Sequence, residues 1–133
     1  MKKQISHVHA FHEAFGIKNE TAPVSNVDEK TYLLRYELMR EENEEYLEAV
    51  KNGDLVEIAD ALGDMMYILS GTILSHGMQH IIEDVFEEIQ RSNMSKLDEN
   101  GKPIYREDGK VLKGANYFKP NIKGILEKNG VKV

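Results

Sequence analysis

Acidic side chains recur at helical spacing in two neighbouring segments of the sequence, and their types favour binding of a hard divalent cation. The first segment carries a stripe in steps of four, three and four, formed by Leu34, Leu38, Glu42, Glu45 and Ala49. Residues at such steps share one face of a helix, so we expect this stripe to point inward. Glu42 and Glu45 therefore stand where apolar side chains are expected.

Three more acids follow on the next predicted helix, which is otherwise almost entirely apolar. Glu57, Asp60 and Asp64 are spaced by three and four residues and so share one face. A short break at Asn52-Gly53 joins the two helices, and antiparallel pairing would set the two acidic faces opposite each other. Buried carboxylates without a compensating charge cost several kcal/mol each, so a positive group is expected among them.

Oxygen ligands from carboxylates are those that magnesium prefers. We therefore predict a Mg²⁺ site, with Mn²⁺ able to substitute, whose ligands are Glu42, Glu45, Asp60 and Asp64. Glu41 lies one step round the helix and is expected to take a proton from water or to hold a second ion. This chemistry suits phosphoryl transfer. The remaining glutamates of the first segment are interpreted as a solvated face.

Positioning these side chains requires a bundle of helices. Apolar periodicity, caps and glycine stops predict an all-α fold of the four-helix-bundle type, with a C-terminal hairpin or loop around Asp108-Gly109. In the first helix the inward position near the middle falls to either Phe11 or His12. The expected helices cover about 3–16, 28–51, 54–75, 78–94 and 120–128.

Length and composition indicate one intracellular domain. The 133 residues fit a single domain, 1–133, with a helical core over about 3–96 and a basic extension over about 97–133. The absence of Cys excludes thiolate chemistry and disulfides. No signal peptide or membrane span is expected, which favours a cytoplasmic protein without a membrane partner.

Charge is unevenly distributed along the chain. Residues 101–133 carry seven Lys and one Arg against three acids, a net charge of +5, which leaves −11 for residues 1–100. An acidic body is a poor surface for nucleic acid, so no nucleic-acid partner is expected. The basic tail could instead cover an anionic small molecule.

Taken together, these motifs resemble the all-α nucleoside triphosphate pyrophosphohydrolase superfamily. This superfamily includes MazG, the dimeric dUTPases and phosphoribosyl-ATP pyrophosphohydrolase, and the sequence is most similar to MazG-like enzymes acting on dUTP. The motifs that carry the resemblance are Phe11–Gly16, Glu41-Glu42-x-x-Glu45, Gly63–Leu69, Arg91–Lys96 and Asp108-Gly109-Lys110.

The family signature is Glu-Glu-x-x-Glu followed by Glu-x-x-Asp on the next helix. Its second half matches either Glu57 and Asp60 or, in the register that also preserves the spacing to Asn93, Ala61 and Asp64. The second register replaces the family glutamate by Ala61, and Asp60 is then the substitute ligand, with Glu57 held in reserve.

The resemblance implies a MazG-like fold and hydrolysis of a (d)NTP to (d)NMP and diphosphate, dUTP and noncanonical nucleotides included. It also implies that Asn93 and Lys96 contact the triphosphate or the sugar, and that the chain forms a homodimer or a dimer of dimers. The alternatives are a pyrophosphohydrolase of the phosphoribosyl-ATP type and a catalytically silent, metal-binding helical interaction module. Loss of the glutamate at Ala61 favours the silent module, whereas the retained Glu41, Asn93 and Lys96 favour activity.

Overall fold

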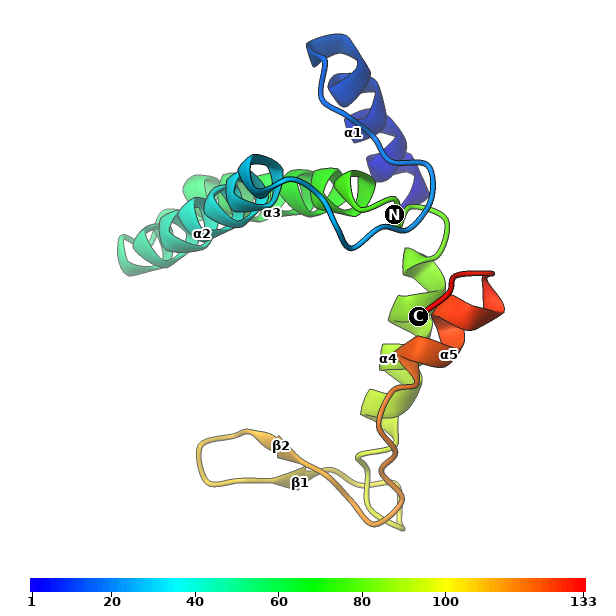
Figure 1. The fold of residues 1–133 in the computed structure, drawn as a ribbon. Coiled ribbons are helices and arrows are strands. Elements are labelled where there is room, and N and C mark those ends of the chain that lie inside the picture. The colour runs from blue at the N-terminus through cyan, green and yellow to red at the C-terminus, as the bar shows by residue number, and fades with distance from the viewer. The chain divides into compact units, whose positions relative to one another are not determined.

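The computed structural model describes all residues, 1–133, and is predominantly helical (Figure 1). Five helices and one short antiparallel hairpin occur in chain order: α1 Lys2–Phe15, α2 Glu29–Lys51, α3 Leu55–Ser75, α4 Ile82–Met94, β1 Ile104–Tyr105, β2 Val111–Leu112 and α5 Ile122–Lys128. The all-α prediction is confirmed. The chain falls into two compact units, Met1–His80 and Ile81–Val133, and its predicted single-domain organisation stays a prediction.

The first unit consists of α1, α2 and α3, with α3 packed against both of the others. Side-chain caps set the starts of the long helices, because Asp28 accepts a hydrogen bond from the Thr31 amide and Asp54 from the Glu57 amide. Between α2 and α3, Gly53 adopts a φ of 63°, which lets the chain reverse within a few residues. The core of this unit consists of Ile5, Val8, Ala49, Ala61, Ile68, Ile73 and Leu74.

In the first unit the structure corrects one sequence-based expectation and decides between two stated alternatives. Leu34 does not begin the buried stripe of α2: it is 54% exposed, whereas the neighbouring Arg35 is only 9% exposed. On α1 the inward position belongs to His12 and not to Phe11, since the buried residues of that helix are Ile5, Val8 and His12. Both faces therefore turn polar groups toward α3.

The second unit consists of α4, the hairpin and α5. Helix α4 begins at Ile82, four residues later than expected, because residues 79–81 form a turn. The side-chain amide of Gln79 donates to the Glu20 carbonyl at 2.7 Å, which ties the end of the first unit to its own loop and holds that turn. In the hairpin, Ile104 pairs with Leu112 and Tyr105 with Val111.

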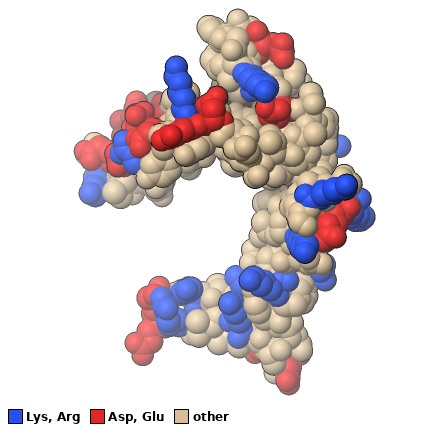
Figure 2. Space-filling view, in the orientation of Figure 1, with Lys and Arg blue, Asp and Glu red and all other residues tan.

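Charge is distributed over the surface as the sequence indicates. Figure 2 shows acidic side chains along the arm formed by α2 and α3, and Lys and Arg side chains over the hairpin. None of the helices combines the length and the apolar character needed to cross a membrane.

Candidate active site

Helices α2 and α3 pack against each other, and the charges of Asp60 and Asp64 on α3 act on Glu42 of α2. Glu42 and Asp64 are half-buried, whereas Glu45 and Asp60 are exposed at the edge of the pair. The Oε2 atom of Glu42 is buried and has no hydrogen-bond partner. A carboxylate oxygen in that situation requires a proton or a cation nearby.

The electrostatics show that these four carboxyl groups are neighbours. The pKa of Glu42 is raised to about 7, first by burial, then by a hydrogen bond with Glu45 and by the negative charges of Glu45, Asp64 and Asp60. The pKa of Asp64 is also raised, by burial and then by the charges of Asp60 and Glu45. Because the charges of Glu45 and Asp60 act on both Glu42 and Asp64, the four carboxyl groups form one acidic cluster.

The cluster fits a hard cation by its chemistry, although its side chains are not already closed around one. No three Asp, Glu or His side chains are arranged as a metal site in the structure. The donor set nevertheless consists only of carboxylate oxygens, and the unpartnered Oε2 of Glu42 provides one free ligand atom inside it. A bound cation would stabilise the ionised carboxylates that otherwise repel each other. The ligand roles of Glu42, Glu45, Asp60 and Asp64 stay a prediction.

The residues next to the cluster help to compare the two ways of matching the family signature on α3, either Glu57 with Asp60 or Ala61 with Asp64. Ala61 is 2% exposed and packs in the core, so its position faces into the helix pair. Asp60 contributes charge to the cluster, as the raised pKa values of Glu42 and Asp64 show. Glu57 lies in the first turn of α3, and it is not among the groups that shift either pKa. Glu41 is exposed on α2, directly beside Glu42.

The predicted substrate contacts, Asn93 and Lys96, lie in the second unit at the end of α4. Asn93 is exposed and Lys96 is half-buried. The backbone amide of Lys96 donates to the Asn93 carbonyl at 3.2 Å, and the Lys96 carbonyl accepts from the Gly114 amide at 2.8 Å. The second bond attaches the segment that follows α4 to the residues that follow β2.

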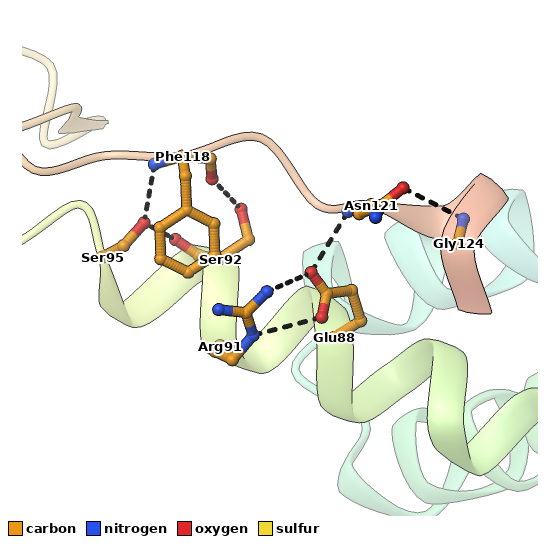
Figure 3. A network of polar contacts seen from close by, with 7 residues as sticks. All are labelled: Glu88, Arg91, Ser92, Ser95, Phe118, Asn121 and Gly124. Atoms are coloured by element: carbon orange, nitrogen blue, oxygen red, sulfur yellow. Dashed lines mark hydrogen bonds and ion pairs between the residues drawn. The ribbon is translucent and has the colours of Figure 1, made fainter. Parts of the chain in front are cut away.

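A polar network then anchors the tail on α4 (Figure 3). The hydroxyl of Ser92 donates to the Phe118 carbonyl at 2.8 Å, and the hydroxyl of Ser95 accepts from the Phe118 amide at 3.1 Å. The Arg91 guanidinium lies 4.3 Å from the centre of the Phe118 ring and also pairs with Glu88. Because Ser92 and Ser95 flank Asn93, and Ser95 directly precedes Lys96, the network holds the backbone on which these two side chains stand.

Sequence reasoning missed one polar residue of the first unit. Arg35 lies seven residues before Glu42, on the same face of α2, and its side chain is buried beside His12 and Gly71. Helical spacing toward the start of α2 allows either Leu34 or Arg35 at the inward position, so spacing could name Arg35 as a candidate but could not select it.

Comparison with known proteins agrees with the fold. The structure is similar to a crystal structure from Exiguobacterium sp. 255-15, for whose protein NTP pyrophosphohydrolase function has been suggested. The TM-score is 0.54 at 23% identity over 95% of this chain and 72% of that one, a likeness that concerns the fold. No curated protein matches the sequence.

The family comparison covers α2 and α3 completely. The model of the family described as phosphoribosyl-ATP pyrophosphohydrolase matches residues 8–93, from α1 to the last turn of α4. This range contains the whole carboxylate cluster and more than half of the chain. The chain thus belongs to the phosphoribosyl-ATP pyrophosphohydrolase family, a family of pyrophosphohydrolases.

Proposed function

We propose that this pyrophosphohydrolase is a cytoplasmic, Mg²⁺-dependent enzyme that converts a (d)NTP and water to a (d)NMP and diphosphate. Its substrate would be dUTP or a noncanonical nucleotide. The observation that carries the proposal is the buried, unpartnered Oε2 of Glu42 within a cluster of four carboxyl groups. The matched family supports the reaction class.

Glu42, Glu45, Asp60 and Asp64 would hold the metal. Bound there, Mg²⁺ would neutralise charge on the phosphate oxygens and lower the pKa of water. Acidic side chains repel a bare triphosphate, so without a cation this surface would exclude its own substrate. Oxygen-only ligands also favour Mg²⁺ or Mn²⁺ over softer metals.

Glu41 is the proposed catalytic residue. Its exposed carboxylate, next to Glu42, would accept a proton from the water whose oxygen attacks the α-phosphorus. The new bond joins the water oxygen to the α-phosphorus, and the bond from that phosphorus to the bridging oxygen breaks. Diphosphate then leaves with the electron pair of the broken bond. Asn93 and Lys96 would bind the triphosphate or the sugar, Lys96 through its positive charge.

A different substrate is the second candidate within the same reaction class. The matched family is described by phosphoribosyl-ATP, so a pyrophosphohydrolase of that type has direct support. A catalytically silent, metal-binding module is the third candidate. The buried Ala61 in place of the family glutamate favours it, because one ligand of the family pattern is absent.

A homodimer or a dimer of dimers is proposed as the working assembly. Within the first unit α3 packs against α1 and α2, and several of its apolar side chains remain uncovered. Leu55 is 77% and Val56 is 76% exposed, and the exposed apolar residues continue along the helix with Leu62, Met66 and Leu69. A second copy that presents the same face would bury this surface.

Release of diphosphate from a panel of nucleotides tests the proposed function. The panel contains the four dNTPs, the four NTPs, dUTP and phosphoribosyl-ATP, with Mg²⁺ or with EDTA. Monophosphate and diphosphate should appear only with the metal, and in H₂¹⁸O the label should appear in the monophosphate. No release from any member, by protein whose helical circular dichroism is intact, would favour the silent module.

A further inference from the structure

Arg35 carries a buried positive charge that no group of this chain balances. The residue is 9% exposed, it forms no hydrogen bond or ion pair, and its Nε atom is buried without a partner. By contrast Arg40, on the same helix, pairs with Glu37 and Glu44, each at 2.8 Å. The difference indicates that the counter-charge of Arg35 comes from elsewhere.

Burial lowers the pKa of Arg35, and no acid beside it raises that pKa again. An arginine in such surroundings still keeps its proton, so the unbalanced charge persists. A guanidinium presents planar donors that match the oxygens of carboxylates and phosphates. The missing group is therefore an oxyanion.

His12 offers a second donor beside this charge. The residue is 2% exposed, and its Nδ1 lies 2.7 Å from Asn19 Oδ1. The Asn19 amide nitrogen faces the oxygens of His9 and Glu13, so its Oδ1 is the acceptor and His12 Nδ1 donates. Only Nε2 then remains for another partner. Burial and the positive charge of Arg35 lower the pKa of His12, and an anion at this place would oppose both effects.

Gly71 of α3 allows both of these side chains to pack closely against the helix. A Cβ atom built on Gly71 would lie 3.1 Å from Arg35 Nη1, from Arg35 Nη2 and from His12 Nε2. The donors of α1 and α2 thus converge beside Gly71, a position of α3 that has no side chain. A cavity of about 130 Å³ lies one turn further along the same helices, where Thr31 and Ser75 line it.

The position of this cluster relates it to the carboxylates. Arg35 precedes Glu42 by seven residues and Gly71 follows Asp64 by seven, which is two turns or about 10 Å along each helix. Because α2 and α3 pack against each other, both clusters lie in the same seam. A substrate held at the carboxylates would have to extend by about this length to reach Arg35.

We propose that Arg35, His12 and Gly71 form a subsite for a phosphoryl oxyanion of the substrate, two turns along the α2/α3 seam from the metal-binding carboxylates. The origin of that group rests on the proposed function. It is either the terminal phosphate of a triphosphate or a second phosphate on a larger nucleotide such as phosphoribosyl-ATP. Both present the same oxygens to the same donors.

Binding of inorganic phosphate in EDTA tests the subsite without turnover. Phosphate should raise the melting temperature of the wild type and give a saturable calorimetric signal, and Arg35→Met and Gly71→Ala should abolish both. Arg35→Met should fold at least as stably as the wild type without phosphate, since an apolar side chain replaces an unbalanced buried charge. Arg40→Met is the matched control and should bind phosphate like the wild type.

The steady-state constants of wild type and Arg35→Met then distinguish the two origins. A KM for NTPs that rises at least about tenfold with kcat little changed would assign the terminal phosphate, tenfold being about the loss of one charge-assisted bond. A rise confined to phosphoribosyl-ATP would assign the second phosphate.

The subsite is overturned if phosphate fails to bind the wild type or binds Arg35→Met equally well. It is also overturned if Arg35→Met dissociates an oligomer that phosphate never affects, because the counter-charge would then belong to a second copy. Absence of hydrolysis by the wild type would count against the proposed function, whereas phosphate binding lost in Arg35→Met would still support the subsite.

Discussion

The carboxyl groups of Glu42 on α2 and Asp64 on α3 lie close enough for the charge of Asp64 to raise the pKa of Glu42. Both groups are half-buried, and both have pKa values above the ordinary range. Two helices have thus been brought together with their acids facing each other. The fold tolerates the repulsion when protons or a cation occupy the cluster.

Stability of the metal-free protein should fall as the pH rises from 5 to 8. The folded-state pKa of Glu42, about 7, exceeds the ordinary value of 4.5. The folded protein therefore binds more protons than the unfolded chain between these values, and stability is lost as pH rises through 7. Thermal unfolding in EDTA should show a decrease of a few degrees, and Glu42→Gln should flatten it. An equal slope in Glu42→Gln would contradict this assignment.

Asp60, and not Glu57, should matter for metal binding. Asp60 acts on the pKa values of both Glu42 and Asp64, whereas Glu57 acts on neither. Asp60→Asn should weaken Mn²⁺ binding by about tenfold or more, the scale expected for the loss of one supporting or ligating carboxylate. Glu57→Gln, the matched control, should leave the calorimetric affinity within about twofold. The reverse order of effects would move the site to the other register.

The tail of the second unit should loosen when Ser92 loses its hydroxyl. Ser92 is buried and donates to the Phe118 carbonyl, so Ser92→Ala leaves that carbonyl without its donor. The expected loss is about 1–3 kcal/mol of local stability. Amide exchange of residues 118–128 should accelerate, while Glu87→Gln on the exposed face of α4 should not change it. Unaltered exchange in Ser92→Ala would show that other contacts hold the tail.

Dimerisation through α3 should depend on the exposed apolar side chains of that helix. Val56 is largely exposed although it lies on an apolar helix, and a charge at that place would have to be buried in the proposed dimer. Val56→Glu should therefore shift sedimentation equilibrium at micromolar concentration toward the monomer. Lys51→Glu, an exposed change at the end of α2, is the control. A monomeric wild type would remove the proposed assembly.

The sequence was sufficient to predict the elements, because each carries local signals. Asp28 and Asp54 cap the long helices, Gly16 ends α1, and the Asp108-Gly109 turn lies in the hairpin. The acids of the cluster were predictable for a similar reason, since helical spacing identifies residues that share a face. Their charge coupling follows from one pairing, that of α2 with α3.

The packing of particular side chains could not be predicted from spacing alone. Neighbouring positions such as Leu34 and Arg35 differ by about 100° round the helix, and which of them faces α3 depends on how the helices cross. An apolar bias selected Leu34, whereas the structure buries Arg35 beside the bare Cα of Gly71. The start of α4 depended on the long-range bond from Gln79 to Glu20, which no local pattern contains.

The central claim is that the carboxylate cluster holds a catalytic cation. The most direct test measures diphosphate release against Mg²⁺ concentration with the best nucleotide of the panel. It compares the wild type with Glu42→Gln and Glu48→Gln. Glu48 is an exposed acid of the same helix and serves as the control. If the clustered carboxylates hold a catalytic cation, Glu42→Gln should lose activity by about 100-fold or more, the upper range for a lost supporting ligand. The activity of Glu48→Gln should stay within about twofold of the wild-type activity. Release that persists in EDTA, or that Glu42→Gln retains at the wild-type rate, would contradict the claim.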